Sequence, residues 1–386
     1  MIPTGGPRPP AATRPPVWLE ALLEAHPPGA SDRQRAFLTE GGPGSLVLFG
    51  AGYQGELTLS DLRAMGLDGS VRCFLDNEAS KWGRTLGGLP ICAPNLLDTL
   101  PKDTRILITS GAYAPIRSQL AEAGFSSGVR ILDLSALRNG LFDRDLLVRA
   151  APTLERLHAM LGDAFSRKVL EGVIAYRLTA DITHVEAVCE PLQYFPDGVV
   201  KLGPKEVFID GGAFDGDTVR TFLAACGGAF ETIHAFEPDP RNAARLRDWI
   251  AGHPDRARIH AHAEALYSHP TELRFEEGPS MSSRIDAVGG TCIQATSLDA
   301  CLQGAPATFI KFDLEGAERA ALKGAEATIR TWRPKLAISA YHLADDLWEL
   351  PAMIAELTPG YRYFLRHYSF LSFETVFYAI PEEQCP

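Results

Sequence analysis

The stretch VFIDGGAFDGDT, residues 207–218, restricts the fold more than any other part of the sequence. Three apolar residues lead into Asp210, and small and acidic residues follow before a helix should begin: Gly212, Ala213, Asp215, Gly216, Asp217 and Thr218. A strand, a turn of small residues and a helix form the first unit of an open parallel sheet, whose ligands bind beyond the carboxyl ends of the strands. The acids would repel a pyrophosphate, so this turn favours a zwitterionic or cationic ligand.

A second acid follows one strand later. The strand expected at 232–239 ends in Glu237, 25 residues after Gly212. A carboxylate in this position can accept hydrogen bonds from both hydroxyls of a ribose. An acidic glycine turn followed by a ribose acid is typical of S-adenosyl-L-methionine sites. The alternative interpretation is that these are ordinary carboxylates at strand ends.

Short apolar runs alternate with helical segments through the rest of the chain, which predicts parallel sheets covered by helices. Beyond 239, we expect strands at 257–268, 308–316, 335–342, 361–369 and 374–380. Only a short loop separates the last two, which leaves no room for a crossover helix. A parallel sheet that ends in such an antiparallel pair is typical of Rossmann-like methyltransferases.

An earlier glycine-rich turn follows another expected strand, at 45–50. FGAGYQG contains the pattern GxGxxG in Gly50, Gly52 and Gly55, and Asp76 ends the next strand, 24 residues after Gly52. The pattern predicts a turn that holds a nucleotide phosphate at the start of a helix. Glycines in such a turn also serve packing alone. An NAD(P) oxidoreductase is disfavoured because no TyrxxxLys pair accompanies the turn.

Changes in composition along the sequence predict four segments, and the overall charge and hydropathy disfavour several classes of function. We expect a proline-rich arm with short helices at 1–40, an N-terminal Rossmann-like domain at 41–137, a helical connector or cap at 138–200, and a second α/β domain at 201–386. The net charge of −11 disfavours a nucleic-acid partner, and no apolar run is long enough for a membrane span. The seven cysteines form no CxxC pair, which indicates reduced thiols and a cytoplasmic protein.

Several motifs together resemble the FkbM-type methyltransferases over about residues 165–380: VFIDGGAFDGDT, HAFEPDP, SLDACL, TFIKFDLEGAERAALKGA and PKLAISAYHLADDLWELP. The resemblance implies O-methyl transfer from S-adenosyl-L-methionine to a hydroxyl of a small molecule, such as a sugar or a polyketide. It implies a mostly parallel C-terminal sheet with an antiparallel last strand, next to a smaller N-terminal α/β domain. Pro238, Glu264 and Ala265 join the expected cofactor contacts. One departure is Phe214, which stands where the general methyltransferase pattern has its middle glycine.

The N-terminal stretch LVLFGAGYQG with FLDNEASKWGRTLGGLPI is similar to the Rossmann-type domain that precedes some members of this family. It also resembles the small nucleotide-sugar-binding domain of sugar acyltransferases. We expect it to support the second domain by binding the acceptor, by holding a nucleotide-like group, or by forming a homo-oligomer. The alternative function for the whole chain is a non-catalytic nucleotide-binding module with a decayed methyltransferase site.

Candidate catalytic groups end two neighbouring strands. Asp313 closes the strand at 308–316 and His342 the strand at 335–342, and a neutral imidazole with a pKa near 6.5 suits a general base. Asp313 could orient this histidine, cap the following helix, or hold a divalent metal such as Mg²⁺ together with Glu315. The acceptor-binding candidates are Ser283, Arg284, Asp346 and Trp348.

Overall fold

The structure, a computed structural model, describes residues 15–125, 128–138, 141, 143–276, 284–285 and 291–385. Its internal contacts divide the chain into two units. The N-terminal unit comprises residues 23–144 and 174–184, and the C-terminal unit comprises residues 1–22, 145–173 and 185–386. The segment that we expected as a connector is therefore shared between them. Among the described residues, no helix is long and apolar enough to cross a membrane.

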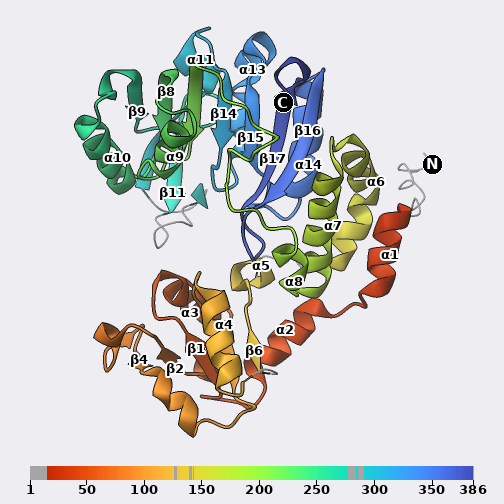
Figure 1. Cartoon of the computed structure of the whole chain (residues 1–386), viewed down its shortest axis with the longest axis vertical. Helices are drawn as coiled ribbons and strands as arrows, with labels where there is room; N and C mark the ends of the chain where they lie inside the picture. Colours follow the sequence, from red (N-terminus) through yellow and green to blue (C-terminus); the bar gives the residue numbers. More distant parts are fainter. Residues whose placement is uncertain are drawn as a thin grey trace, which may run out of the picture. The chain divides into compact units, whose positions relative to one another are not determined.

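A mostly parallel sheet, with one antiparallel edge strand, forms the centre of the N-terminal unit (Figure 1). Its strands, in the order β3-β4-β2-β1-β5-β6, are β3 (Thr85–Leu86), β4 (Leu89–Cys92), β2 (Val71–Leu75), β1 (Leu46–Phe49), β5 (Arg105–Ile108) and β6 (Val129–Arg130). Strand β1 pairs in parallel with β2 and with β5, and all four of its residues are buried. The α-helices assigned to this unit or reaching into it are α1 (Val17–Ala25), α2 (Ala30–Thr39), α3 (Tyr53–Ala64), α4 (Tyr113–Glu122), α5 (Leu134–Arg138), α7 (Ala164–Thr179) and α8 (Thr183–Glu186).

One expected strand of this unit is much shorter than its apolar pattern suggested. The apolar run VRILDLS at 129–135 favours a strand over its whole length, but β6 ends at Arg130 and helix α5 begins at Leu134. The carboxylate of Asp133 accepts the backbone N–H of Ala136 at 2.8 Å. This contact satisfies a free donor of a first helical turn, so the aspartate starts a helix where hydrophobicity alone favoured a strand.

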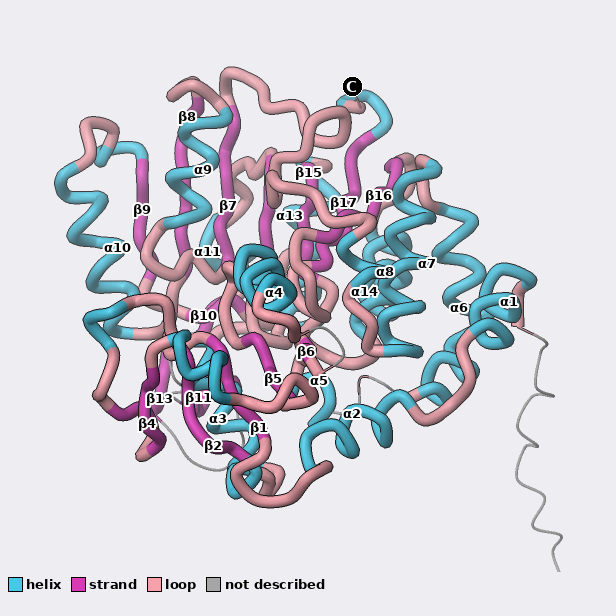
Figure 2. The backbone as a smooth tube through the Cα atoms, turned by 60° about the horizontal axis from the view of Figure 1, so that its bottom comes forward, coloured by secondary structure: helices cyan, strands magenta, loops and turns pink. Residues whose placement is uncertain are grey.

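A seven-stranded sheet forms the C-terminal unit, and Figure 2 shows its strands side by side. In the order β16-β17-β15-β14-β7-β8-β9 they are β16 (Tyr361–His367), β17 (Thr375–Pro381), β15 (Lys335–Ser339), β14 (Phe309–Phe312), β7 (Glu206–Gly211), β8 (Phe230–Phe236) and β9 (Ile259–His262). The pairs from β15 to β9 are parallel, whereas β17 runs antiparallel to both β15 and β16. The predicted antiparallel ending is confirmed.

A topological switch point lies between β7 and β14, which are adjacent in this sheet. The chain leaves β7 toward β8 and β9, and then returns to place β14 on the other side of β7. The turns that follow β7 and β14 therefore diverge, and open α/β sheets bind their ligands in the crevice between such turns. The chain order alone thus places the site above Gly211 and Phe312.

Helices and a small extra sheet complete the C-terminal unit. The α-helices are α6 (Arg144–Met160), which begins at the unit boundary, α9 (Asp217–Ala225), α10 (Pro240–Gly252), α11 (Leu298–Leu302), α12 (Glu318–Lys323), α13 (Glu326–Trp332) and α14 (Asp346–Leu357). The extra sheet, which the sequence did not lead us to expect, has the order β10-β13-β11-β12 and contains β10 (Ala265–Leu266), β13 (Thr291–Thr296), β11 (Thr271–Glu276) and β12 (Arg284–Ile285). A partly buried ion pair at 2.7 Å between Arg366 of β16 and Asp163 attaches the start of α7 to this unit.

The turn after β7 contains a close backbone approach that only glycine permits. Gly212 has a φ of +77°, and a Cβ atom on it would lie 1.9 Å from the carbonyl oxygen of Asp313, which follows β14. Both conditions exclude a side chain, because the left-handed region disfavours L-residues and the overlap with a carbonyl oxygen is too severe. The two turns at the switch point are therefore fixed against each other.

Gly212→Ala should destabilise the C-terminal unit much more than the same change at an uncrowded glycine. Gly228 is a matched control, because its φ is +78° and nothing lies within 4 Å of its Cβ position. Backbone strain alone should cost Gly228→Ala about 1–2 kcal/mol. Overlap with Asp313 should add about 1–3 kcal/mol at Gly212. Urea unfolding of both variants measures the difference, and equal losses would contradict the close approach.

Candidate active site

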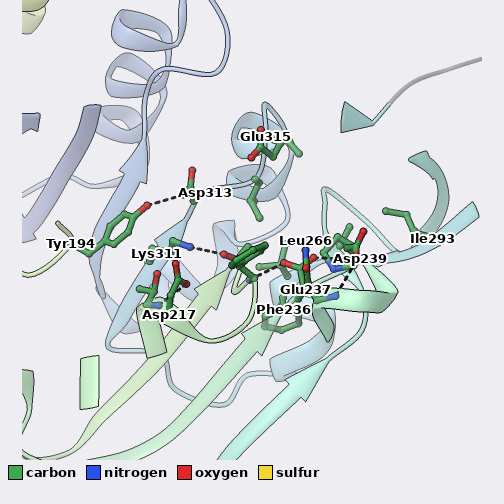
Figure 3. Close-up of a pocket in the computed structure, with 18 of the residues that line it drawn as sticks. Tyr194, Asp217, Phe236, Glu237, Asp239, Leu266, Ile293, Lys311, Asp313 and Glu315 are labelled. Atoms are coloured by element: carbon green, nitrogen blue, oxygen red, sulfur yellow. Dashed lines mark hydrogen bonds between the residues drawn. The ribbon is translucent and has the colours of Figure 1, made fainter. Parts of the chain in front are cut away.

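A cavity of about 270 Å³ opens beyond the carboxyl ends of β7, β8 and β14. Figure 3 shows its two ends: Glu237 and Asp239 lie on one side, Tyr194 and Asp313 on the other. The first end is formed by the segments after β8 and β9, and the second by the segments that precede β7 and follow β14. The cavity thus lies at the switch point that the strand order indicates.

Glu237 anchors the first end of the cavity. Its carboxylate accepts the backbone N–H of Phe214 at 2.9 Å and that of Asp239 at 2.9 Å, one with each oxygen. Burial raises the pKa of Glu237 to about 7, although both backbone hydrogen bonds favour the charged form. The carboxylate is therefore held in one place on the cavity wall and keeps lone pairs for a ligand.

Apolar side chains surround Glu237. Phe236, Leu266 and Ile293 lie beside it in Figure 3, and Pro238 and Ala265 also line this end. Apolar walls beside a carboxylate suit a heterocycle joined to a ribose. Of the expected cofactor contacts, Pro238 and Ala265 thus lie at the cavity, whereas Glu264 does not line it.

Asp210 lies in the protein interior and does not line the cavity. The side chain is fully buried, and the Nζ atom of Lys311 lies 3.0 Å from its carboxylate. Lys311 also donates to the carbonyl oxygen of Gly212 at 2.8 Å. Burial raises the pKa of Asp210 to about 6. Burial would lower the pKa of Lys311, but Asp210 and Asp313 outweigh this effect and raise it. The expected ligand contact of Asp210 is thus replaced by an ion pair that holds the turn.

The other residues of the acidic turn divide into two groups. Gly212, Asp217 and Thr218 line the cavity, and Phe214 lines it as well. Asp215 instead forms an ion pair with Arg220 at 2.5 Å, away from the cavity lining. Ala213 and Gly216 are not in contact with the cavity, and Gly216 precedes helix α9 with a φ of +92°.

Asp313 forms the second end of the cavity. Its two oxygens accept hydrogen bonds from the hydroxyls of Tyr194 at 2.9 Å and Tyr341 at 3.1 Å. Burial would raise the pKa of Asp313, but the charges of Lys311 and His342 outweigh it and lower the pKa. Asp313 is therefore a stable carboxylate with several donors around it.

His342 lies behind Asp313 among three carboxylates. Its Nδ1 atom is 2.8 Å from Glu318, and its Nε2 atom is 3.4 Å from Asp313 and 3.8 Å from Glu315. Burial alone would lower the pKa of His342, but Glu318, Glu315 and Asp313 outweigh it and raise the pKa to about 10. The ring is then an imidazolium at neutral pH. This corrects the expectation of a neutral imidazole, which overlooked Glu318.

The residues around His342 also form a group that could be considered as a metal site. Ligand atoms of Asp313, Glu318 and His342 all lie within 4.8 Å of one another. Mg²⁺ prefers oxygen ligands and retains several waters, whereas one member here is an imidazole and both oxygens of Asp313 accept phenol hydroxyls. Glu315, the expected second ligand, is not part of this group. The arrangement does not fit the Mg²⁺ site that the sequence left open as one of three roles for Asp313, since the imidazolium already supplies the positive charge.

Two of the expected acceptor-binding residues, Asp346 and Trp348, do not line the cavity. Asp346 is buried, accepts the N–H of Leu343 at 2.7 Å and forms an ion pair with Arg319 at 2.9 Å. Trp348 is buried within helix α14. Ser283 lies outside the described residues, as does the side chain of Arg284.

Sequence reasoning missed several residues that line the second end of the cavity, near Asp313: Gln193, Tyr194 and Glu374. Tyr341, which bonds Asp313, was also missed. Gln193 and Tyr194 precede β7, and Glu374 precedes β17, so none of them follows a strand of the parallel core. The structure contains one feature that marks these residues, which is a backbone in the left-handed region. Of the seven described non-glycine residues with positive φ, four line this cavity: Tyr194, Phe214, Glu315 and Glu374.

The N-terminal unit has a cavity of its own, of about 350 Å³. Gly50, Gly52, Asp76 and Lys81 line it, together with the residues that follow β5. The carboxylate of Asp76 accepts the N–H of Ala51 at 2.7 Å and lies 3.1 Å from Lys81. Gly50 and Gly55 are needed for packing, since Cβ atoms there would meet backbone oxygens at 2.5 Å and 2.2 Å. Gly55 does not line the cavity.

Residues 210–371, which run from the end of β7 to just beyond β16, match the model of the methyltransferase FkbM domain. This part of the chain is an FkbM methyltransferase domain. The crystal structure of methyltransferase FkbM from Methylobacillus flagellatus KT is 24% identical and has a TM-score of 0.70, covering 94% of this chain and 99% of its own. At 24% identity, this similarity shows that the two proteins share a fold.

Two further structures are more distant from the FkbM domain. Fibrillarin from Aeropyrum pernix, in complex with S-adenosyl-L-methionine, is 12% identical over 47% of this chain and 70% of its own, with a TM-score of 0.30. Precorrin-6y C5,15-methyltransferase from Geobacter metallireducens GS-15 is 12% identical over 47% of this chain and 82% of its own, also with a TM-score of 0.30. No curated protein matches the chain.

The charge on His342 should make the FkbM domain lose stability at alkaline pH. Because the folded pKa is about 10, above the unfolded value near 6.5, the stabilisation is complete below about pH 6.5 and is lost as the pH rises through about 10. The difference in unfolding free energy between wild type and His342→Gln should therefore shrink from pH 6.5 to pH 10. Urea unfolding at several pH values measures it. His269→Gln, at an exposed histidine, is the control variant measured in parallel. A constant difference for His342→Gln would contradict the charged state.

Proposed function

We propose that the FkbM domain transfers a methyl group from S-adenosyl-L-methionine to a hydroxyl oxygen of a small, neutral acceptor such as a sugar or a polyketide. The observation that carries the proposal is the cavity itself. Glu237 stands among apolar walls at one end, and polar groups around Asp313 stand at the other. The first end suits an adenosine, and the second suits a hydroxylated acceptor.

The charge of the cavity supports this ligand. Among the described lining residues, six are acids (Asp217, Glu237, Asp239, Asp313, Glu315 and Glu374), and Lys311 is the one basic residue. Lys311 is itself paired with the buried Asp210. An excess of carboxylates attracts a sulfonium and an ammonium group and repels a pyrophosphate. A neutral acceptor is favoured over an anionic one for the same reason.

S-adenosyl-L-methionine supplies an activated methyl group on its sulfonium, so the protein must align an acceptor oxygen and remove its proton. Tyr194 and Tyr341 hold the carboxylate of Asp313 toward the acceptor end. In this proposal Asp313 accepts a hydrogen bond from the acceptor, and His342 stabilises its charge from behind. His342 cannot take the proton at neutral pH, because its pKa of about 10 leaves it protonated.

Glu237→Gln should weaken binding of S-adenosyl-L-homocysteine by roughly 10- to 150-fold, because hydrogen bonds from ribose hydroxyls to a charged acceptor are worth about 1.5–3 kcal/mol. Titration calorimetry measures the change. Glu231→Gln, at an exposed glutamate of the same strand, should leave the affinity unchanged.

Two outcomes would count against the proposal. If the wild-type protein does not bind S-adenosyl-L-homocysteine, the non-catalytic alternative with a decayed site gains support. If both variants bind equally well, Glu237 does not hold the ribose.

A second candidate function concerns the N-terminal cavity, which lies at the switch point between β1 and β5 of its own sheet. Gly52 is the N-cap residue before helix α3 and has an ordinary φ of −112°, and nothing lies within 4 Å of its Cβ position. Neither conformation nor packing thus requires glycine there. A glycine beside a helix start permits a phosphate to approach the backbone, so we propose that this cavity binds a nucleoside diphosphate.

Gly52→Leu should fill part of the N-terminal cavity and reduce binding of ADP or UDP by at least about tenfold, or about 1.4 kcal/mol. Gly69→Leu is a matched control in the same unit, since Gly69 also lacks a positive φ and has nothing within 4 Å of its Cβ position. Calorimetric titrations with ADP, UDP and inorganic phosphate measure the effect. If the wild-type chain binds none of the three, this second function is abandoned.

A further inference from the structure

We infer that Glu374 is the general base, which takes the proton from the acceptor hydroxyl during methyl transfer. The inference rests on the proposed function of the FkbM domain. Glu374 lines the same cavity as Asp313. It comes from the loop between β16 and β17, which is far along the sequence from the glycine turn after β7. Nothing in the pattern of strand-end acids points to it.

The backbone at Glu374 holds the side chain in an unusual way. Its φ is +65°, and its carbonyl oxygen accepts the N–H of Tyr368 at 3.0 Å, which closes the loop between the two strands. A non-glycine residue in the left-handed region costs about 1–2 kcal/mol. Glycine would form this turn without that cost, so the glutamate serves something other than the turn. Strained residues of this kind gather at functional sites.

The neighbours of Glu374 fix its carboxylate and leave room for a substrate. The amide of Gln193 donates to one carboxylate oxygen, Oε2. Asp313 and Lys311 face Glu374 from β14, Tyr341 and His342 from the segment after β15, and Tyr194 from the segment before β7. Glu374 lines the cavity and is partly exposed, and its second oxygen, Oε1, is the one that we assign to the acceptor hydroxyl.

The other polar groups at this end are worse bases. Asp313 accepts two phenol hydroxyls and lies beside an imidazolium, which stabilises its charge and lowers its proton affinity. Burial strongly raises the pKa values of Tyr194 and Tyr341, so both stay protonated. Glu315 is 40% exposed and lies 3.8 Å from the charged His342.

The electrostatics of Glu374 differ from those of Asp313. Burial raises the pKa of Glu374 to about 7, and the nearby Asp313 adds to the rise. The hydrogen bond from Gln193 and the charges of His342 and Lys311 act against it. A base is most effective when its pKa lies near the working pH, because it is then deprotonated yet still binds a proton well. The charge on Asp313 therefore makes Glu374 the better proton acceptor.

The step balances in atoms and charge. The acceptor oxygen forms a bond to the methyl carbon while the carbon–sulfur bond breaks, and the electron pair of that bond stays on sulfur. The acceptor proton moves to Oε1 of Glu374, which becomes a neutral carboxylic acid. Glu374 then releases this proton to water before the next turnover.

Glu374→Gln tests the inference, because it keeps the size of the side chain and removes the proton acceptor. Methyl transfer from radiolabelled S-adenosyl-L-methionine to a panel of neutral methyl glycosides should slow by about 10²- to 10⁴-fold. Affinity for S-adenosyl-L-homocysteine should stay unchanged. Glu356→Gln, at an exposed glutamate of helix α14, should transfer methyl groups at the wild-type rate.

The pH profile separates this role from a structural one. At saturating cofactor, wild-type kcat should rise through about pH 7, whereas Glu374→Gln should show no such rise. Glu237 also has a pKa of about 7, but its ionisation acts on cofactor binding and should appear in KM for the cofactor. A glutamine variant with wild-type kcat and an unchanged pH profile would overturn the inference while leaving the proposed function intact.

A second measurement needs no acceptor. In protein labelled with ¹³C at glutamate carboxyls and saturated with S-adenosyl-L-homocysteine, one signal should titrate near pH 7 and be absent from the Glu374→Gln variant. If the signal that disappears titrates below about pH 5, Glu374 is an ordinary carboxylate and the inference fails. If S-adenosyl-L-homocysteine does not bind to the wild type, the proposed function fails first.

Discussion

The buried ion pair between Asp210 and Lys311 determines where the cavity of the FkbM domain can form. It joins β7 to β14 at their carboxyl ends, and Lys311 also holds the carbonyl of Gly212. Removing one member of such a pair leaves an uncompensated buried charge, at a cost of about 3–5 kcal/mol. Because Gly212 in turn contacts the backbone of Asp313, this one pair sets the distance between the cofactor end and the acceptor end.

The fold and the place of Glu237 in the cavity were predictable because their signals are local in the sequence. Apolar runs gave the strands of the parallel core, and Glu237 followed from its place at the end of β8. The same reasoning misjudged Asp210, since a residue type at a strand end does not reveal whether the side chain faces a ligand or the interior. Only the position of Lys311 on the neighbouring strand decides that.

The acceptor end depends on contacts that no local pattern contains. The hydroxyl of Tyr194 reaches Asp313 across 119 positions of the sequence. The charge of His342 depends on Glu318, which stands in the first turn of α12 and faces the ring because of the way the loop after β14 folds back. Glu374 belongs to the antiparallel edge of the sheet, where ligand sites are not expected from topology. Strained backbone at Tyr194 and Glu374 marks this end, but φ angles cannot be read from residue types.

The acidic lining also affects what happens after the reaction. Before transfer, the proposed cofactor carries a positive sulfur between the carboxylates of the cavity, and afterwards that sulfur is neutral. The attraction that draws the charged form in therefore acts less on the spent form. An enzyme with such walls discriminates between the two by charge, although they differ by a single methyl group. Under the proposed function, the excess of acids therefore favours the charged form over the spent form where both are present.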